Sequence, residues 1–128
     1  MRLEEAPQAL RFAGIGLAAT IVHVSVAAIA IALLSVSVAL ANALAVLSAS
    51  LLSYFGHALW TFKAPPTAGS LLRFVAVTAA AAALAALLAA LVAKVGASWW
   101  TGIAVTAVVV PVFSYCAHRS WTFRRTCH

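Results

Sequence analysis

Histidine is the residue of this chain best suited to proton chemistry, and two of its four histidines recur in one pattern. His57 lies in residues 53–62 and His118 in residues 114–123, and both segments read Ser-Tyr-x-x-His-x-x-Trp-Thr-Phe. The chain contains no Asp, and its only acids are two glutamates near the N-terminus. Carboxylate acid–base catalysis is therefore nearly excluded, and histidine is the one group expected to titrate within the apolar segments.

Arginine suggests a second chemistry, the binding of phosphate. Leu-Arg-Phe occurs twice and places Arg11 and Arg73 62 residues apart, while Arg119 directly follows the second repeated histidine. The guanidinium group matches phosphate oxygens in a bidentate way, so three such groups near one level predict a pocket for a lipid phosphate. The alternative is that these side chains extend to the lipid headgroups as ordinary topology signals.

Both patterns indicate an internal duplication. The Leu-Arg-Phe copies are 62 residues apart and the histidine motifs 61, so one residue of length change lies between them. We predict a first repeat at residues 10–63, a linker at residues 64–70 and a second repeat at residues 71–125. All of these belong to one domain, residues 1–128.

The elements that position these residues must be membrane-spanning helices. The chain is 66% hydrophobic and 8% charged with a mean hydropathy of +1.10, whereas an ordinary soluble domain is about 25% charged. We expect an all-α integral membrane protein with four transmembrane helices near residues 12–34, 38–60, 74–93 and 99–121. The net charge of +6 does not indicate nucleic-acid binding, because the bases are spaced between apolar runs.

Basic residues predict the orientation of the spans. Lys94 alone lies on one side, and seven bases lie on the side that holds both termini and the central loop, namely Arg2, Arg11, Lys63, Arg73, Arg119, Arg124 and Arg125. The positive-inside rule then places both termini in the cytoplasm. Because each repeat has two spans, the two-helix repeats are parallel, and both histidine motifs lie at the cytoplasmic boundary.

Polar residues within the spans form predicted stripes. At 100° per residue, five side chains of the second span fall within about 120°, which is one helix face: Asn42, Ser50, Ser53, Tyr54 and His57. Ser114, Tyr115 and His118 share a face of the fourth span. His23 lies at the centre of the first span, where an ionisable group suggests function. A neutral histidine bonded to a facing polar group is the alternative.

Other residues suggest anchoring and packing. The four tryptophans, Trp60, Trp99, Trp100 and Trp121, lie near predicted span ends, as interfacial anchors do. The third span is rich in alanine, which allows close helix packing and suggests a homodimer interface.

Cys127 and His128 are too few to hold a metal alone, so no metal site is expected. No cofactor and no catalytic residue are expected either. For the two repeated histidines, the alternative to a functional role is a structural one, in which the imidazole hydrogen-bonds to a backbone carbonyl at the end of the helix beside the tryptophan.

These residues resemble the GtrA-like family of small bacterial membrane proteins. The resemblance rests on Leu-Arg-Phe-x-x-x-Gly at residues 10–16, on four spans, and on Tyr-x-x-polar-x-x-Trp-Thr-Phe at the end of a span. The family usually has Asn-Arg before the aromatic residues, where this chain has His57-Ala58 and His118-Arg119. The resemblance implies a role in cell-surface polysaccharide synthesis, as a flippase for polyprenyl-phosphate-linked sugars.

The hypothesis from the sequence is therefore translocation without chemistry, in the bacterial cytoplasmic membrane. The three arginines and the two repeated histidines would hold the phosphate, and the polar stripes would line the sugar path. A non-transporting adaptor for a glycosyltransferase is the first alternative. A small multidrug-type exporter is the second, although it would normally need an intramembrane carboxylate that the spans lack.

Overall fold

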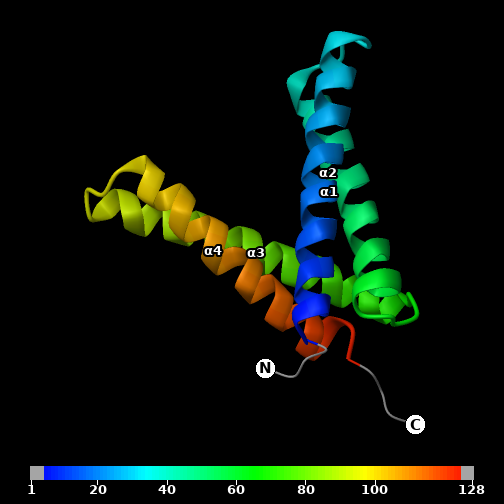
Figure 1. The fold of residues 1–128 in the computed structure, drawn as a ribbon. Coiled ribbons are helices and arrows are strands. Elements are labelled where there is room, and N and C mark those ends of the chain that lie inside the picture. Colours follow the sequence, from blue (N-terminus) through cyan, green and yellow to red (C-terminus); the bar gives the residue numbers. More distant parts are fainter. Residues whose placement is uncertain (1–4, 125–128) are drawn as a thin grey trace. The chain divides into compact units, whose positions relative to one another are not determined.

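Four long helices make up most of the part of the chain that the structure describes. The computed structural model describes residues 5–124, and over that range it contains no strand. Its elements are α1 (Glu5–Ala32), α2 (Val38–Gly56), η1 (His57–Thr61), α3 (Ala68–Lys94), α4 (Trp99–Ala117) and η2 (His118–Thr122), shown in Figure 1. Each long helix is apolar over a length that can cross a membrane. The expected all-α membrane architecture with four spans is confirmed.

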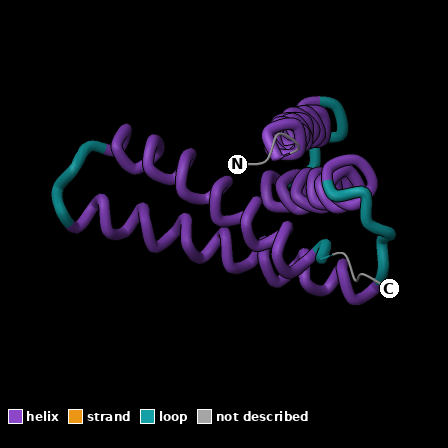
Figure 2. Tube along the Cα trace, turned by 60° about the horizontal axis from the view of Figure 1, so that its bottom comes forward, coloured by secondary structure: helices purple, strands orange, loops and turns teal. Residues whose placement is uncertain are grey.

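The chain divides into two compact units, each a helical hairpin. Unit 1 comprises residues 1–65 and unit 2 residues 66–128. Within unit 1, α1 packs against α2 and η1, and within unit 2, α3 packs against α4 and η2. Figure 2 shows the short loops that join the helices of each hairpin. The predicted repeats at 10–63 and 71–125 fall one in each unit, except that Arg125 lies outside the described residues, as does Arg2. Their origin by duplication and the orientation of the termini stay predictions.

Small residues bring the helices of unit 1 close together. Ala30, Ala41 and Ala45 are all buried where α1 and α2 meet near their connected ends. Farther along, a Cβ atom added to Gly56 would lie 2.6 Å from Cδ1 of Ile15. A residue with a side chain at position 56 would therefore require the Ile15 side chain to shift.

Side-chain caps decide where the helices begin. Ser37 and Ser98 accept hydrogen bonds from the third residue of α2 and α4, respectively. Thr67 caps α3 in a reciprocal box with Ser70. The capped helix starts at residue 68, within the linker predicted for residues 64–70.

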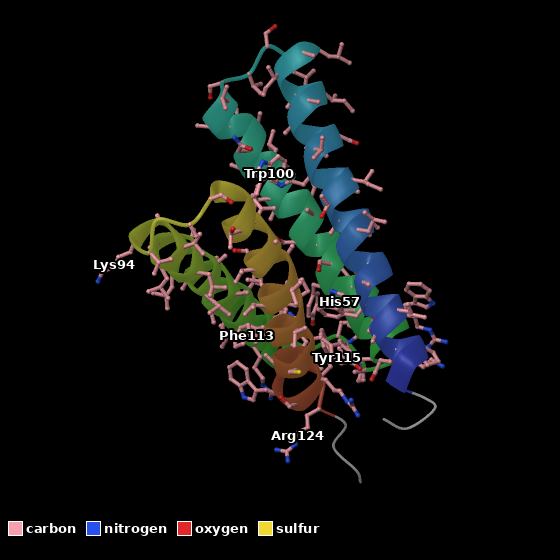
Figure 3. All side chains as sticks on the ribbon, turned by 60° about the vertical axis from the view of Figure 1, so that its left-hand side comes forward. His57, Lys94, Trp100, Phe113, Tyr115 and Arg124 are labelled. Carbon is pink, nitrogen blue, oxygen red and sulfur yellow. The ribbon has the colours of Figure 1, made fainter. Side chains whose placement is uncertain are left out.

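Unit 2 has a groove near its connected end. A groove of about 610 Å³ lies between α3 and α4 and is lined by small apolar side chains, among them Ala85, Ala89 and Gly102. Most alanines of α3 are exposed, and the homodimer suggested for them stays a prediction. Lys94 lies at this connected end, whereas Tyr115 and Arg124 lie at the opposite end of the hairpin (Figure 3).

Candidate functional site

The second helix of each hairpin ends in one widened turn. Residues 57–61 and 118–122 are π-helical, so that Phe62 N–H donates to the His57 carbonyl at 2.8 Å and Phe123 N–H to the His118 carbonyl at 2.9 Å. Turns of this kind are rare and are frequent at functional sites. The sequence predicted that these helices continue as ordinary spans to the tryptophans, and it gave no sign of the extra residue in the turn.

In unit 1 the widened turn surrounds His57 with partners. The imidazole ring stacks on the ring of Phe12 with centroids 4.3 Å apart and planes 16° from parallel. Its Nδ1 lies 3.3 Å from the Thr61 hydroxyl oxygen, and the ring of Phe62 approaches it at 6.2 Å. Only 3% of His57 is exposed. We call Phe12, His57, Thr61 and Phe62 the unit 1 histidine cluster.

Unit 2 contains the same arrangement at the equivalent positions. His118 stacks on Phe74 with centroids 4.9 Å apart and planes 17° from parallel. Its Nδ1 lies 3.0 Å from the Thr122 hydroxyl oxygen, and Phe123 lies 5.9 Å away, ring to ring. His118 is 4% exposed. These four residues are the unit 2 histidine cluster.

The histidine clusters were only half anticipated. The sequence pattern marked both histidines as equivalent, but it assigned them to a lipid phosphate and did not assign any role to Phe12, Phe74, Thr61 or Thr122. The signal was present, because all four belong to the repeated motifs. In the structure each imidazole is buried against an aromatic ring and a hydroxyl. This arrangement favours a packing role over direct contact with a phosphate.

Each unit also brings an arginine to a tryptophan. The Arg11 guanidinium carbon lies 6.0 Å from the ring centroid of Trp60, within the range of a cation–π interaction. In unit 2, Arg73 donates a hydrogen bond to the Trp121 carbonyl at 3.2 Å, and such a bond satisfies a helix-end acceptor. A guanidinium group carries five N–H donors, so one such bond leaves donors for a ligand.

The third candidate arginine marks a difference between the units. Arg119 lies on η2 and is exposed, whereas the equivalent residue of unit 1, Ala58, is fully buried. Arg73 and Arg119 thus belong to one hairpin, and Arg11 belongs to the other. The shared pocket expected for all three stays a prediction.

The predicted polar stripe is only partly covered by protein. Tyr54 is buried, and five of its other members are partly buried: His23, Ser50, Ser53, Ser114 and Tyr115. Asn42 is exposed. At the positions of unit 2 equivalent to His23 and Asn42 the chain has Ala85 and Ile103. Unit 1 thus carries polar side chains at two positions where unit 2 has apolar ones.

The described tryptophans at the helix ends are largely exposed. Trp60 and Trp121 are each 51% exposed and Trp100 is 63% exposed, as expected for side chains that meet lipid headgroups. The side chain of Trp99 lies outside the described part of the structure. Among the described residues, no group of three or more His, Cys, Asp or Glu side chains is placed to hold a metal.

Comparison with known proteins gives one match. A family model described as GtrA/DPMS, transmembrane domain, matches residues 11–123. No curated protein and no solved structure matches. The matched segment begins at Arg11 and ends at Phe123, so it contains both histidine clusters and nearly all of both hairpins.

Proposed function

Because the chain belongs to the GtrA/DPMS transmembrane family, we propose that it moves a polyprenyl-phosphate-linked sugar from the cytoplasmic to the outer leaflet. The observation that carries the proposal is the family match over residues 11–123. The membrane would be the cytoplasmic membrane of a bacterium, with both termini inside. No bond of the substrate is made or broken in this process.

The phosphate is the part of such a lipid that needs protein contacts in the membrane. A buried charge is costly unless it is paired, and guanidinium groups pair with phosphate through two parallel hydrogen bonds. We assign this contact to Arg11, Arg73 and Arg119. In support, Arg73 and Arg119 belong to the same hairpin and both are exposed.

The sugar needs hydrogen-bonding groups along its path. Unit 1 supplies most of them, and the path residues we propose are His23, Asn42, Ser50, Ser53, Tyr54, Ser114 and Tyr115. All of them except the buried Tyr54 are at least partly exposed, which supports the assignment, because a side chain closed off by its own unit cannot meet a ligand. The energy source and the identity of the sugar are outside this proposal.

Exchange between leaflets is the direct test. Liposomes that contain only the purified protein receive a radiolabelled polyprenyl-phosphate sugar, and its accessibility to a membrane-impermeant reagent is followed. We expect exchange faster than in protein-free liposomes, and its loss in an Arg73→Gln, Arg119→Gln variant. Lys94→Gln is the matched control, because it removes a base at the opposite end of the same hairpin.

The alternative function predicts another result. If folded protein leaves exchange at the protein-free rate with several sugar headgroups, translocation by this chain alone is wrong. The adaptor reading then gains support if a glycosyltransferase co-purifies with the chain from membranes and loses membrane attachment when the gene is deleted.

A further inference from the structure

Two neighbouring residues of α1 point to different partners. Phe12 places its ring on His57, while Arg11 lies against Trp60. Successive residues of a helix project about 100° apart, so both contacts can form only at one rotation of α1 about its axis. In unit 2, Phe74 stacks on His118 and Arg73 reaches the Trp121 backbone. The same rotation is thus selected twice.

On the second helix of each hairpin, the widened turn buries the histidine and the threonine and leaves the tryptophan exposed. Within η1, His57 and Thr61 are buried at 3% exposure each, whereas Trp60 is 51% exposed. Within η2, His118 and Thr122 are 4% and 2% exposed, and Trp121 is again 51% exposed. The histidine and threonine therefore face the first helix of the hairpin, and the tryptophan faces away from the core at the level of the arginine.

We propose that His57 and His118 are positioning residues that do not touch the lipid. Each packs the widened turn against the phenylalanine of the first helix, and this contact fixes where the preceding arginine, Arg11 or Arg73, presents its guanidinium group to a phosphate. The inference deepens the proposed function and rests on it for the identity of the ligand. It replaces the direct phosphate contact expected for both histidines.

The surroundings of the imidazole rings support this role over direct binding. In both units Nδ1 is engaged by the threonine hydroxyl, and one face of the ring is covered by phenylalanine. Neither residue is more than 4% exposed. The arginine and tryptophan of each pair have greater exposure than the histidine, so a ligand would meet them first.

Two variants of unit 1 distinguish the ring contact between Phe12 and His57 from binding through the imidazole nitrogens of His57. Phe12→Leu removes the aromatic partner and keeps His57 and Thr61. The double variant His57→Phe, Thr61→Val keeps a ring on Phe12, removes the imidazole and avoids leaving an unpaired hydroxyl. If His57 has a positioning role, Phe12→Leu should lose the placement of Arg11 and bind phosphate more weakly. The double variant should keep both the placement of Arg11 and the affinity for phosphate close to those of the native protein. Direct binding by histidine predicts the reverse.

The first measurement needs no lipid ligand. In a background with Trp99→Phe, Trp100→Phe and Trp121→Phe, the emission spectrum of Trp60 reports the nearby guanidinium, and Arg11→Gln defines the spectrum without it. We expect Phe12→Leu to give the Arg11→Gln spectrum and the double variant to give the native one. If Phe12→Leu leaves the spectrum native, the positioning role is refuted, whatever the function of the protein.

The second measurement uses undecaprenyl phosphate in lipid nanodiscs. We expect Arg11→Gln and Phe12→Leu to weaken binding by a similar factor of about five to ten, as for one charge-assisted contact. The double variant should bind within about twofold of the native protein, which is the additivity error of such comparisons. A double variant that binds as weakly as Arg11→Gln would show that histidine itself contacts the phosphate.

Controls keep the outcomes distinct. Phe113→Leu removes a ring from α4 outside both histidine clusters and should leave binding and the Trp60 spectrum native. If Phe12→Leu fails to fold, judged by circular dichroism and size exclusion, Phe74→Leu tests the same claim in unit 2, in a background that keeps Trp121 as the reporter and changes Trp60, Trp99 and Trp100 to Phe, with Arg73→Gln as the reference. If the native protein does not bind undecaprenyl phosphate, the phosphate assignment fails, and the fluorescence result still decides the positioning role.

Discussion

Phe12 of α1 and His57 of η1 lie ring on ring, with centroids 4.3 Å apart and planes 16° from parallel. The same relationship joins Phe74 to His118 in unit 2, at 4.9 Å and 17°. A stacked aromatic pair contributes about 0.5–1.5 kcal/mol beyond its burial. At the end of each hairpin opposite its connecting loop, this stack joins the first helix to the widened turn, and the His–Thr contact lies within that turn.

The crossing of α1 and α2 leads to a prediction about volume. Gly56→Ala should destabilise the protein by about 1–3 kcal/mol, as overpacking does, because the new Cβ would meet Cδ1 of Ile15 at 2.6 Å. Unit 2 has Ala117 and Val77 at the equivalent positions, so its second helix carries one methyl group more and its first helix one carbon fewer than in unit 1. Gly56→Ala with Ile15→Val should therefore recover most of the loss.

Thermal unfolding in detergent measures this pair. Ile15→Val alone is the control for the lost methylene group and should cost less than about 1.5 kcal/mol. If the destabilising effects of the two substitutions simply add, with no recovery in the double variant, the volumes of residues 15 and 56 do not compensate each other across this contact.

The connection between α1 and α2 predicts a stabilising change. Ser35 has a φ of 52°, and the equivalent residue of unit 2 is Gly96, with a φ of 68°. A left-handed backbone costs a residue with a Cβ atom roughly 1–2 kcal/mol, part of which is offset by the freedom of unfolded glycine. Ser35→Gly should raise the unfolding temperature by a few degrees, and Gly96→Ser should lower it. A fall after Ser35→Gly would show that its side chain has another role.

His23 should affect transport and not phosphate binding. Its equivalent in unit 2 is Ala85, so alanine is compatible with this fold at that level of a hairpin. We expect His23→Ala to slow leaflet exchange of the lipid-linked sugar severalfold while the affinity for undecaprenyl phosphate stays native. Ser25→Ala, two residues along the same exposed helix, is the control and should change neither. Equal exchange rates in the two variants would remove His23 from the sugar path.

Cysteine labelling decides the orientation. In a background with Cys116→Ser and Cys127→Ser, Pro66→Cys places a thiol in the loop between the units, and Ala97→Cys places one between α3 and α4; both positions are exposed. A membrane-impermeant maleimide applied to intact cells should label residue 97 and not residue 66, and everted vesicles should give the opposite result. Labelling of residue 66 from outside would reverse the predicted topology.

Much of the fold follows from local sequence. The four spans are readable because a membrane helix must be apolar for about 20 residues. Ser37 and Ser98 mark the starts of α2 and α4 as expected, since the hydroxyl satisfies an N–H group that the helix leaves unpaired. The start of α3 was placed too late, because the Gly-Ser pair at residues 69–70 resembles a loop and becomes helical only through the cap of Thr67.

The sequence marked some residues of the candidate site and not their arrangement. The recurrence of His57 and His118 was visible, and so was that of the arginines and tryptophans. Their partners were not, because a periodicity of 100° per residue describes an ordinary α-helix and the last turn of α2 and α4 is a π-helix. One extra residue in a turn changes which side chains face inward, and no local pattern announces it.

The sequence by itself determined the membrane class, the number of spans, the family and the two equivalent motifs, since these depend on composition and spacing along the chain. Only the tertiary structure decided that Phe12 and Phe74 stack on the histidines. It also decided that Arg11 lies near the Trp60 ring and that Arg73 donates to the Trp121 carbonyl. The reason is physical. Which face of one helix meets which face of another depends on contacts between residues about 45 positions apart, and the energy of such contacts exists only once the hairpin has closed.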